Sequence, residues 1–374
     1  FYIDLRPVPS AGWITEWAVD FQMDVGTQEV TLSWNVDELG EGTYTLMDAV
    51  GGVFFSEDMK EMESYSFPSS FNRVIIRHSF STGMTISYTE GWNMVGLPLG
   101  VEDASYNLIF PESIEGTLYS FDGGYITELY LTSGEGYWLR FANAGSTTID
   151  GIPINELTIS LSEGWNLVSG ISETVSISSV SDPDGIIVPG SLYGFTGTYA
   201  SSSELTPGKG YWLRTSAPGD ITISGGASAR TPAPLFTDQT KDANILSFNG
   251  SELYFGISIP EENILSYQLP PKPPVGAFDV RFADDMKVAG TEGAIDVMNN
   301  TDRLTISYTI NIDVGEHLRW VLTSDEGKEY ELNDFGEILV SGDVTGFTLN
   351  KASSVPLKFA VSQNYPNPFN PVTS

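Results

Sequence analysis

The chain has 374 residues and a formal net charge of −32, from 17 basic and 49 acidic side chains. A chain this acidic is repelled by phosphate backbones and disfavoured at anionic membrane surfaces, which excludes nucleic acid as a partner class. It has no cysteine and two histidines, so disulfides, thiolate zinc sites, cysteine nucleophiles and His-rich metal centres are excluded. No apolar run is long enough for a membrane-spanning helix.

The local pattern of the sequence is typical of β-structure. Runs of β-branched and aromatic residues alternate with polar ones at 30–34, 74–77, 157–161 and 305–310, between turn residues. Few amphipathic helices separate them. The sequence therefore predicts an all-β fold of several antiparallel β-sandwich or β-barrel modules in tandem, with immunoglobulin-like flanking domains around a duplicated β-repeat.

Residues 1–84 are predicted to form the first β-sandwich, truncated at its start. Trp34, Tyr44, Leu46 and Phe54 alternate with polar neighbours, and the pair Gly51-Gly52 predicts a hairpin turn between strands at 45–47 and 53–55. His78 is interpreted as structural, and Asp20 and Asp24 as solvated charges. Both chain ends look like interior segments, so we expect a piece of a longer protein.

A duplication follows, with copies predicted at 85–157 and 158–228. Glu90-Gly91-Trp92-Asn93 returns as Glu163-Gly164-Trp165-Asn166, and Gly136-Tyr137-Trp138-Leu139-Arg140 returns as Gly210-Tyr211-Trp212-Leu213-Arg214. The period of about 70 residues exceeds that of ordinary solenoids, which indicates a small β-module per copy or half a barrel. These blocks resemble the Gly-Trp-Asn-Leu-Val…Gly-Tyr-Trp repeats of many secreted bacterial and archaeal surface proteins, and the resemblance implies extracellular modules.

The repeated aromatic residues admit two interpretations. Trp92, Trp138, Trp165 and Trp212 are candidates for a sugar-stacking platform, in which case some of them should be exposed and coplanar. The alternative, which the strand context favours, is that they pack in the core with their indole N–H groups paired. Arg140 and Arg214, at the ends of the repeated strands, are expected to pair with carboxylates.

Residues 229–350 are predicted to form a second β-sandwich, after a Pro-rich linker at 231–234. A further proline run at 269–274 predicts a stiff extended segment inside this domain. Strands are expected at 277–282, 304–310 and 317–322, with a hairpin-like turn at 325–327. Asp284 and Asp285 are interpreted as solvated charges and His317 as structural.

Motifs for catalysis or cofactor binding are sparse. The sequence holds neither Gly-x-Ser-x-Gly nor a Gly-rich phosphate loop, so no catalytic residue and no cofactor are assigned. Asp182 and Asp184 lie in an Asp-Pro-Asp-Gly turn and are weak candidates for a Ca²⁺ site. Turn chemistry alone also explains these residue types.

The most specific motif ends the chain, in a segment of linker and sorting sequence at 351–374. It consists of Gln363, Asn364, Tyr365, Pro366, Asn367, Pro368, Phe369, Asn370 and Pro371. This run resembles the opening of the C-terminal sorting domain of type IX secretion substrates. The resemblance implies a partner, the type IX secretion machinery, and a secreted or cell-surface location in a Gram-negative bacterium.

Three functions follow as hypotheses. The first is a non-enzymatic extracellular structural or adhesive protein, with copies of itself as partners in a filament or surface layer assembled by β-strand pairing or donation. Its strand-like start at Phe1 and its Pro-rich tail are the candidate exchanging segments. The alternative is a polysaccharide-binding accessory region of a larger secreted hydrolase. An enzyme, such as a β-sandwich hydrolase that uses two acids, comes third.

Overall fold

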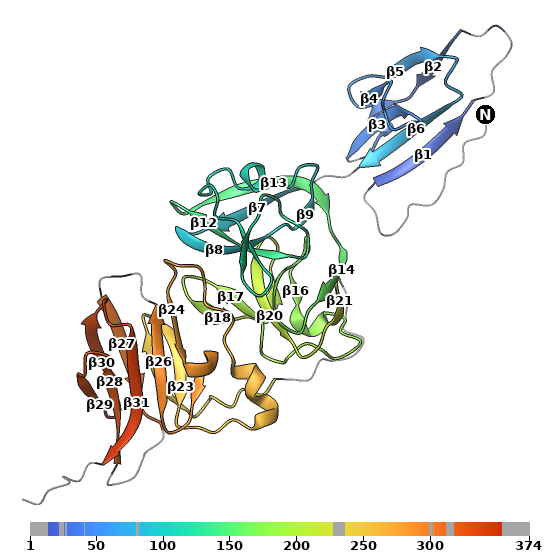
Figure 1. Ribbon diagram of the computed structural model, residues 1–374. Coiled ribbons are helices and arrows are strands. Elements are labelled where there is room, and N and C mark those ends of the chain that lie inside the picture. Colours follow the sequence, from blue (N-terminus) through green and yellow to red (C-terminus); the bar gives the residue numbers. More distant parts are fainter. Residues whose placement is uncertain are drawn as a thin grey trace, which may run out of the picture. The chain divides into compact units, whose positions relative to one another are not determined.

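The computed structural model describes residues 14–21, 26, 28–40, 42–79, 82–226, 236–298, 301, 303–311 and 318–353 (Figure 1). Strands make up 53% of the chain and helices about 6%, and most sheets are small and antiparallel. This confirms the all-β prediction. Among the described residues, no helix combines the length and apolar character that a bilayer crossing requires.

The first module is a sandwich of two antiparallel sheets. One sheet has the order β1-β6-β3-β4 and the other pairs β2 with β5. Their bounds are β1 (Ile14–Asp20), β2 (Glu29–Ser33), β3 (Thr43–Asp48), β4 (Ser56–Asp58), β5 (Ser64–Pro68) and β6 (Arg73–Ser79), with a 3₁₀ turn η1 (Val36–Glu38). Leu46 and Val74 from one sheet meet Phe67 from the other in a shared core. The strands predicted at 30–34 and 74–77 are therefore confirmed.

The hairpin in this module differs from its prediction in one respect. Gly51 and Gly52 both adopt positive φ, as the predicted turn requires, but the returning strand β4 begins at Ser56. Phe54 is consequently 70% exposed, and Phe55 takes the core position at 8%. The Asp48 carboxylate causes this shift, because it accepts hydrogen bonds from the backbone N–H groups of Phe54 and Phe55 and holds 49–55 as a wide turn.

The first copy of the repeat contains a four-stranded sheet and a second, smaller one. The sheets have the orders β11-β10-β12-β8 and β7-β13-β9. The bounds are β7 (Thr82–Tyr88), β8 (Gly91–Gly96), β9 (Leu99–Gly100), α1 (Tyr106–Ile109), β10 (Tyr119–Phe121), β11 (Tyr125–Thr127), β12 (Gly136–Phe141) and β13 (Gly145–Pro153). The two sheets enclose a core of their own, in which Tyr88 stacks on Phe141.

The second copy repeats this arrangement around a second core. Its four-stranded sheet has the order β15-β20-β17-β18, and β14 pairs with β21 as β7 does with β13. The bounds are β14 (Glu156–Leu161), β15 (Gly164–Ser169), β16 (Val175–Ser176), η2 (Ile177–Ser179), β17 (Tyr193–Phe195), β18 (Tyr199–Ser201), β19 (Glu204–Leu205), β20 (Gly210–Thr215) and β21 (Gly219–Ser224). The register is also repeated, since Tyr119 lies opposite Trp138 and Tyr193 lies opposite Trp212.

The two copies pack against each other with pseudo-twofold symmetry. The Gly96 N–H donates to the carbonyl oxygen of Gly208, and the N–H of Ser169, the counterpart of Gly96, donates to that of Gly134, the counterpart of Gly208. A Cβ atom on Gly136 would lie 2.5 Å from the Val168 oxygen, and one on Gly210 would lie 2.8 Å from the Val95 oxygen. These contacts of one copy are thus matched by reciprocal contacts of the other, as at an isologous dimer interface.

A second sandwich forms from two five-stranded sheets, β25-β23-β22-β27-β30 and β24-β26-β31-β28-β29. The bounds are β22 (Asn244–Phe248), β23 (Ser251–Phe255), η3 (Glu261–Tyr267), β24 (Asp279–Phe282), η4 (Ala283–Asp285), β25 (Val288–Ala289), β26 (Gly293–Met298), β27 (Arg303–Thr309), β28 (Leu318–Ser324), β29 (Glu329–Leu332), β30 (Phe335–Ser341) and β31 (Gly346–Ser353). One continuous core lies between the sheets, with Phe248, Phe347 and Trp320 in it. The turn predicted at 325–327 joins β28 to β29 and is confirmed.

The proline run belongs to a different unit from the residues around it. By their contacts, Phe1–Phe236 together with Pro270–Ala277 form one compact unit, and Thr237–Leu269 with Phe278–Ser374 form the other. The chain therefore leaves the second sandwich after Leu269, packs with the duplicated repeat, and returns at Phe278. We call Pro270–Ala277 the proline strap.

Candidate functional site

The repeated tryptophans lie in an aromatic cluster built by both copies. Trp138 meets Phe195 of the other copy edge to face, with ring centroids 4.7 Å apart, and its counterpart Trp212 meets Phe121 at 4.8 Å. These reciprocal pairs cross the pseudo-twofold axis. Burial and edge-to-face packing of such large rings make them a main source of cohesion between the copies.

The sugar-stacking candidates are mostly enclosed. Trp138 and Trp212 are fully buried and Trp92 is 8% exposed, while Trp165 is half-buried. The indole planes of Trp92 and Trp138 are 89° apart, and those of Trp165 and Trp212 are 83° apart. Rings that are buried and perpendicular do not form a flat platform for a pyranose ring, so the geometry favours the packing interpretation.

The two repeated arginines differ from their expectation. Arg140 lies over the Trp92 ring, 5.9 Å from its centroid, and Arg214 lies over the Trp165 ring at 5.6 Å. In the described part of the chain, the arginine ion pairs are those of Arg73, Arg77, Arg281 and Arg319. Burial lowers the pKa of Arg214, and the charge of Glu163 partly opposes that effect. Cation–π contact with the tryptophan of the same copy is their main interaction.

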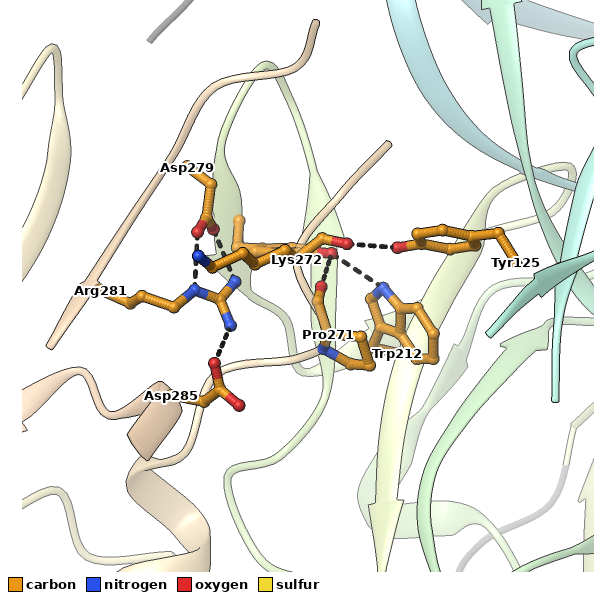
Figure 2. A network of polar contacts seen from close by, with 8 residues as sticks. Tyr125, Trp212, Pro271, Lys272, Asp279, Arg281 and Asp285 are labelled. Atoms are coloured by element: carbon orange, nitrogen blue, oxygen red, sulfur yellow. Dashed lines mark hydrogen bonds and ion pairs between the residues drawn. The ribbon is translucent and has the colours of Figure 1, made fainter. Parts of the chain in front are cut away.

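Side chains of both copies donate hydrogen bonds to backbone carbonyl groups of the proline strap. The Tyr199 hydroxyl donates to the Pro271 oxygen at 2.6 Å, and the Tyr125 hydroxyl donates to the Lys272 oxygen at 2.7 Å (Figure 2). The Trp92 indole N–H donates to the Val275 oxygen at 3.1 Å. Tyr125 and Tyr199 are counterparts in the two copies, so one tyrosine from each binds adjacent carbonyls of the same segment.

Local structure positions these donors and the strap. Tyr125 and Tyr199 begin β11 and β18, the outer hairpin strands of the two four-stranded sheets. The Trp212 indole N–H donates to the Tyr199 oxygen at 3.1 Å, which fixes that hydroxyl (Figure 2). In the strap, Gly276 has φ of 92° and the Ala277 N–H donates to the Pro274 oxygen, a turn that presents the Val275 carbonyl to Trp92.

The calcium candidates form a capped turn. The two oxygens of Asp182 accept hydrogen bonds from the N–H groups of Ile186 and Ile187, at 3.0 and 2.9 Å. Asp184 lies in the same turn, before Gly185, which adopts positive φ. Within the described residues, no group of three or more potential metal-ligating side chains occurs. The turn hydrogen bonds account for Asp182.

A buried ion-pair network, which the sequence did not single out, lies in the second sandwich. Arg281 binds Asp279 through two hydrogen bonds of 2.6 and 2.8 Å, and both side chains are buried (Figure 2). Its third nitrogen binds the more exposed Asp285 at 2.8 Å. Burial alone lowers the pKa of Arg281, but the two carboxylates reverse this and raise it above its ordinary value. Asp285 is therefore an ion-pair partner rather than a free surface charge.

The remaining sequence candidates have simple roles or lie outside the described residues. His78 stacks on Tyr44 with ring centroids 4.3 Å apart, and Asp20 pairs with Arg73 at 2.6 Å. Asp24, His317, the linker at 231–234 and the whole sorting motif from Gln363 to Pro371 are outside the described residues. The two strap-binding tyrosines were missed as a site, although Tyr125 and Tyr199 recur at matched positions in the duplication.

Comparison with protein families, with curated proteins and with solved structures finds no match to this chain.

Proposed function

We propose that the chain is a non-enzymatic structural module of an extracellular surface protein, able to act as a spacer or as the subunit of a filament. The observation that carries this proposal is that the repeated aromatic residues are used in packing: Trp138 and Trp212 join the two copies, and Tyr125 and Tyr199 hold the strap. The resemblance of the tail to type IX sorting sequences supports export to the cell surface.

The carboxylates of the β-modules support a structural role as well. Asp48, Asp182 and Asp325 each accept backbone N–H groups in turns. We further propose that both flanking sandwiches are immunoglobulin-like, which their pairs of packed, mainly antiparallel sheets support.

Strand β30 is the best-supported place for contact between two molecules of this protein. It is an edge strand, and among the described strands it pairs only with β27. Its side chains Phe335 and Leu339 are 81% and 59% exposed. An apolar edge strand with unpaired backbone groups is a template for pairing with another chain.

Electron microscopy of the secreted protein tests this proposal. Regular filaments or sheets that disappear in a Leu339→Lys variant would establish assembly through β30. Separate strings of modules would establish the spacer role instead. Hydrolysis of glycan or peptide substrates by the purified chain would contradict the proposal.

The polysaccharide-binding alternative has less support, because only Trp165 of the four repeated tryptophans is more than marginally accessible. Saturable quenching of tryptophan fluorescence by a polysaccharide, if it is abolished by Trp165→Ala, would support the polysaccharide-binding alternative.

A further inference from the structure

The proline strap is bound through its backbone, in the manner of a peptide ligand. It is held through main-chain carbonyls, by two tyrosine hydroxyls and one indole N–H. Pro273 and Pro274 are buried, whereas Lys272, Val275 and Gly276 remain exposed. The carbonyl side of the segment is thus engaged by the two copies.

The chemistry of this contact suits proline-rich sequences. Proline has no N–H to leave unpaired, and its carbonyl oxygen is a good acceptor, so an extended proline-rich segment offers a row of acceptors and apolar rings. Aromatic side chains that combine a flat apolar surface with an O–H or N–H donor match both features, as in other grooves that bind such peptides. Stiffness of the segment lowers the entropy lost on binding.

The duplication explains why the donors are paired. Tyr125 and Tyr199 occupy equivalent positions in the two copies, and their hydroxyls bind the adjacent carbonyls of Lys272 and Pro271. Neither copy alone supplies both donors, so the site exists only where the copies meet.

We propose that the two copies together form a binding site for extended proline-rich peptides, and that the strap is its resident ligand. In this site, the side chains of Tyr125, Tyr199 and Trp92 donate hydrogen bonds to main-chain carbonyl groups of the peptide. A proline-rich segment of another chain binds there when the strap is displaced. This inference holds whether or not the protein forms filaments.

The test uses the full chain with its strap weakened by Pro270→Ser, Pro271→Ser, Pro273→Ser and Pro274→Ser. A fluorescein-labelled peptide with the wild-type sequence of residues 269–277 is titrated and followed by fluorescence anisotropy. We expect saturable binding to the serine variant, at least about tenfold tighter than to the wild-type chain, in which the strap occupies the site. Adding Tyr125→Phe and Tyr199→Phe should weaken that binding about tenfold, because two hydrogen bonds are lost.

Two controls decide the result. A peptide with its prolines replaced by serine should bind at least about tenfold more weakly, and Tyr130→Phe, at an exposed tyrosine of the first copy, should leave binding unchanged. No binding to a folded serine variant, or equal binding of the proline-free peptide, would overturn the proposal.

If the serine variant does not fold, hydrogen exchange replaces the titration. In the otherwise wild-type chain, Tyr125→Phe with Tyr199→Phe should speed exchange of the Ala277 amide about tenfold, and Tyr130→Phe should not. Unchanged exchange in the double variant would overturn the proposal.

Discussion

At the scale of single residues, carboxylates and glycines fix the turns and close contacts of the molecule. The side chain of Asp48 accepts hydrogen bonds from Val50, Phe54 and Phe55. Its burial by itself raises its pKa, but these N–H groups outweigh that effect and hold the pKa of Asp48 below its ordinary value. The carboxylate form is thus the one that the folded turn stabilises.

This gives a pH-dependent prediction for the first module. Because the pKa of folded Asp48 is lowered, its stabilisation is complete above the ordinary aspartate pKa of 3.8 and is lost as the pH falls through the lowered value. Asp48→Asn should therefore reduce hydrogen-exchange protection of residues 49–55 at neutral pH, and the difference from wild type should shrink in acid. Glu61→Gln, a carboxyl-to-amide change at an exposed site of the same module, is the control. An equal difference at all pH values would contradict the assignment.

At the scale of elements, the strands were predictable and the way they meet was not. Alternation predicted the strands at 30–34, 157–161 and 305–310, because a half-buried strand imposes a period of two on its own sequence. The sequence predicted Phe54 in the core, but Phe55 lies there instead. This was not predictable, since it depends on the side-chain hydrogen bonds of Asp48. The contact between the copies was not predictable from local sequence either, because Gly136 and Gly210 were recognised only as members of the repeated block.

The second prediction concerns Gly136 and Gly210. Gly136→Ala and Gly210→Ala should each destabilise the repeat by about 1–3 kcal/mol, because the added methyl group would overlap backbone atoms of Val168 and Val95 in the other copy. Chemical denaturation followed by tryptophan fluorescence measures the loss. Gly124→Ala is the control, since a Cβ at Gly124 meets no atom within 4 Å. A loss at Gly124 as large as at Gly136 would show that the backbone, rather than the contact between copies, is responsible.

At the scale of the whole molecule, the alternating sequence pattern predicted the class of fold but left the candidate site unassigned. The proline run was recognisable as stiff and extended, yet its hydrogen-bond partners lie 72 to 183 residues away in two separate copies, a relation that no local pattern records. Among the described residues, the first module, each copy of the repeat and the second sandwich each have a hydrophobic core of their own.

The net charge of −32 leads to the third prediction. Self-repulsion among so many carboxylates destabilises the compact state, and salt screens it over a Debye length of about 10 Å at 0.1 M. Melting temperatures measured by circular dichroism should therefore rise between about 10 mM and 500 mM NaCl. A sodium sulfate series at equal ionic strength separates screening from surface-exclusion effects. Melting temperatures that stay constant across the NaCl series would contradict the prediction.

The pseudo-twofold arrangement of the copies has a consequence for the direction in which a bound segment runs. In a dimer of identical chains, an extended segment on the axis could run either way with equal energy. Fusion into one chain lets the two copies differ: position 135 holds a glutamate that accepts from the Tyr137 hydroxyl, while its counterpart Lys209 donates to the Ser87 carbonyl of the opposite copy. Likewise Trp92, not its counterpart Trp165, holds the Val275 carbonyl. Fusion of the two copies can thus give a nearly symmetric binding site a single polarity, so that an extended segment binds there in one orientation.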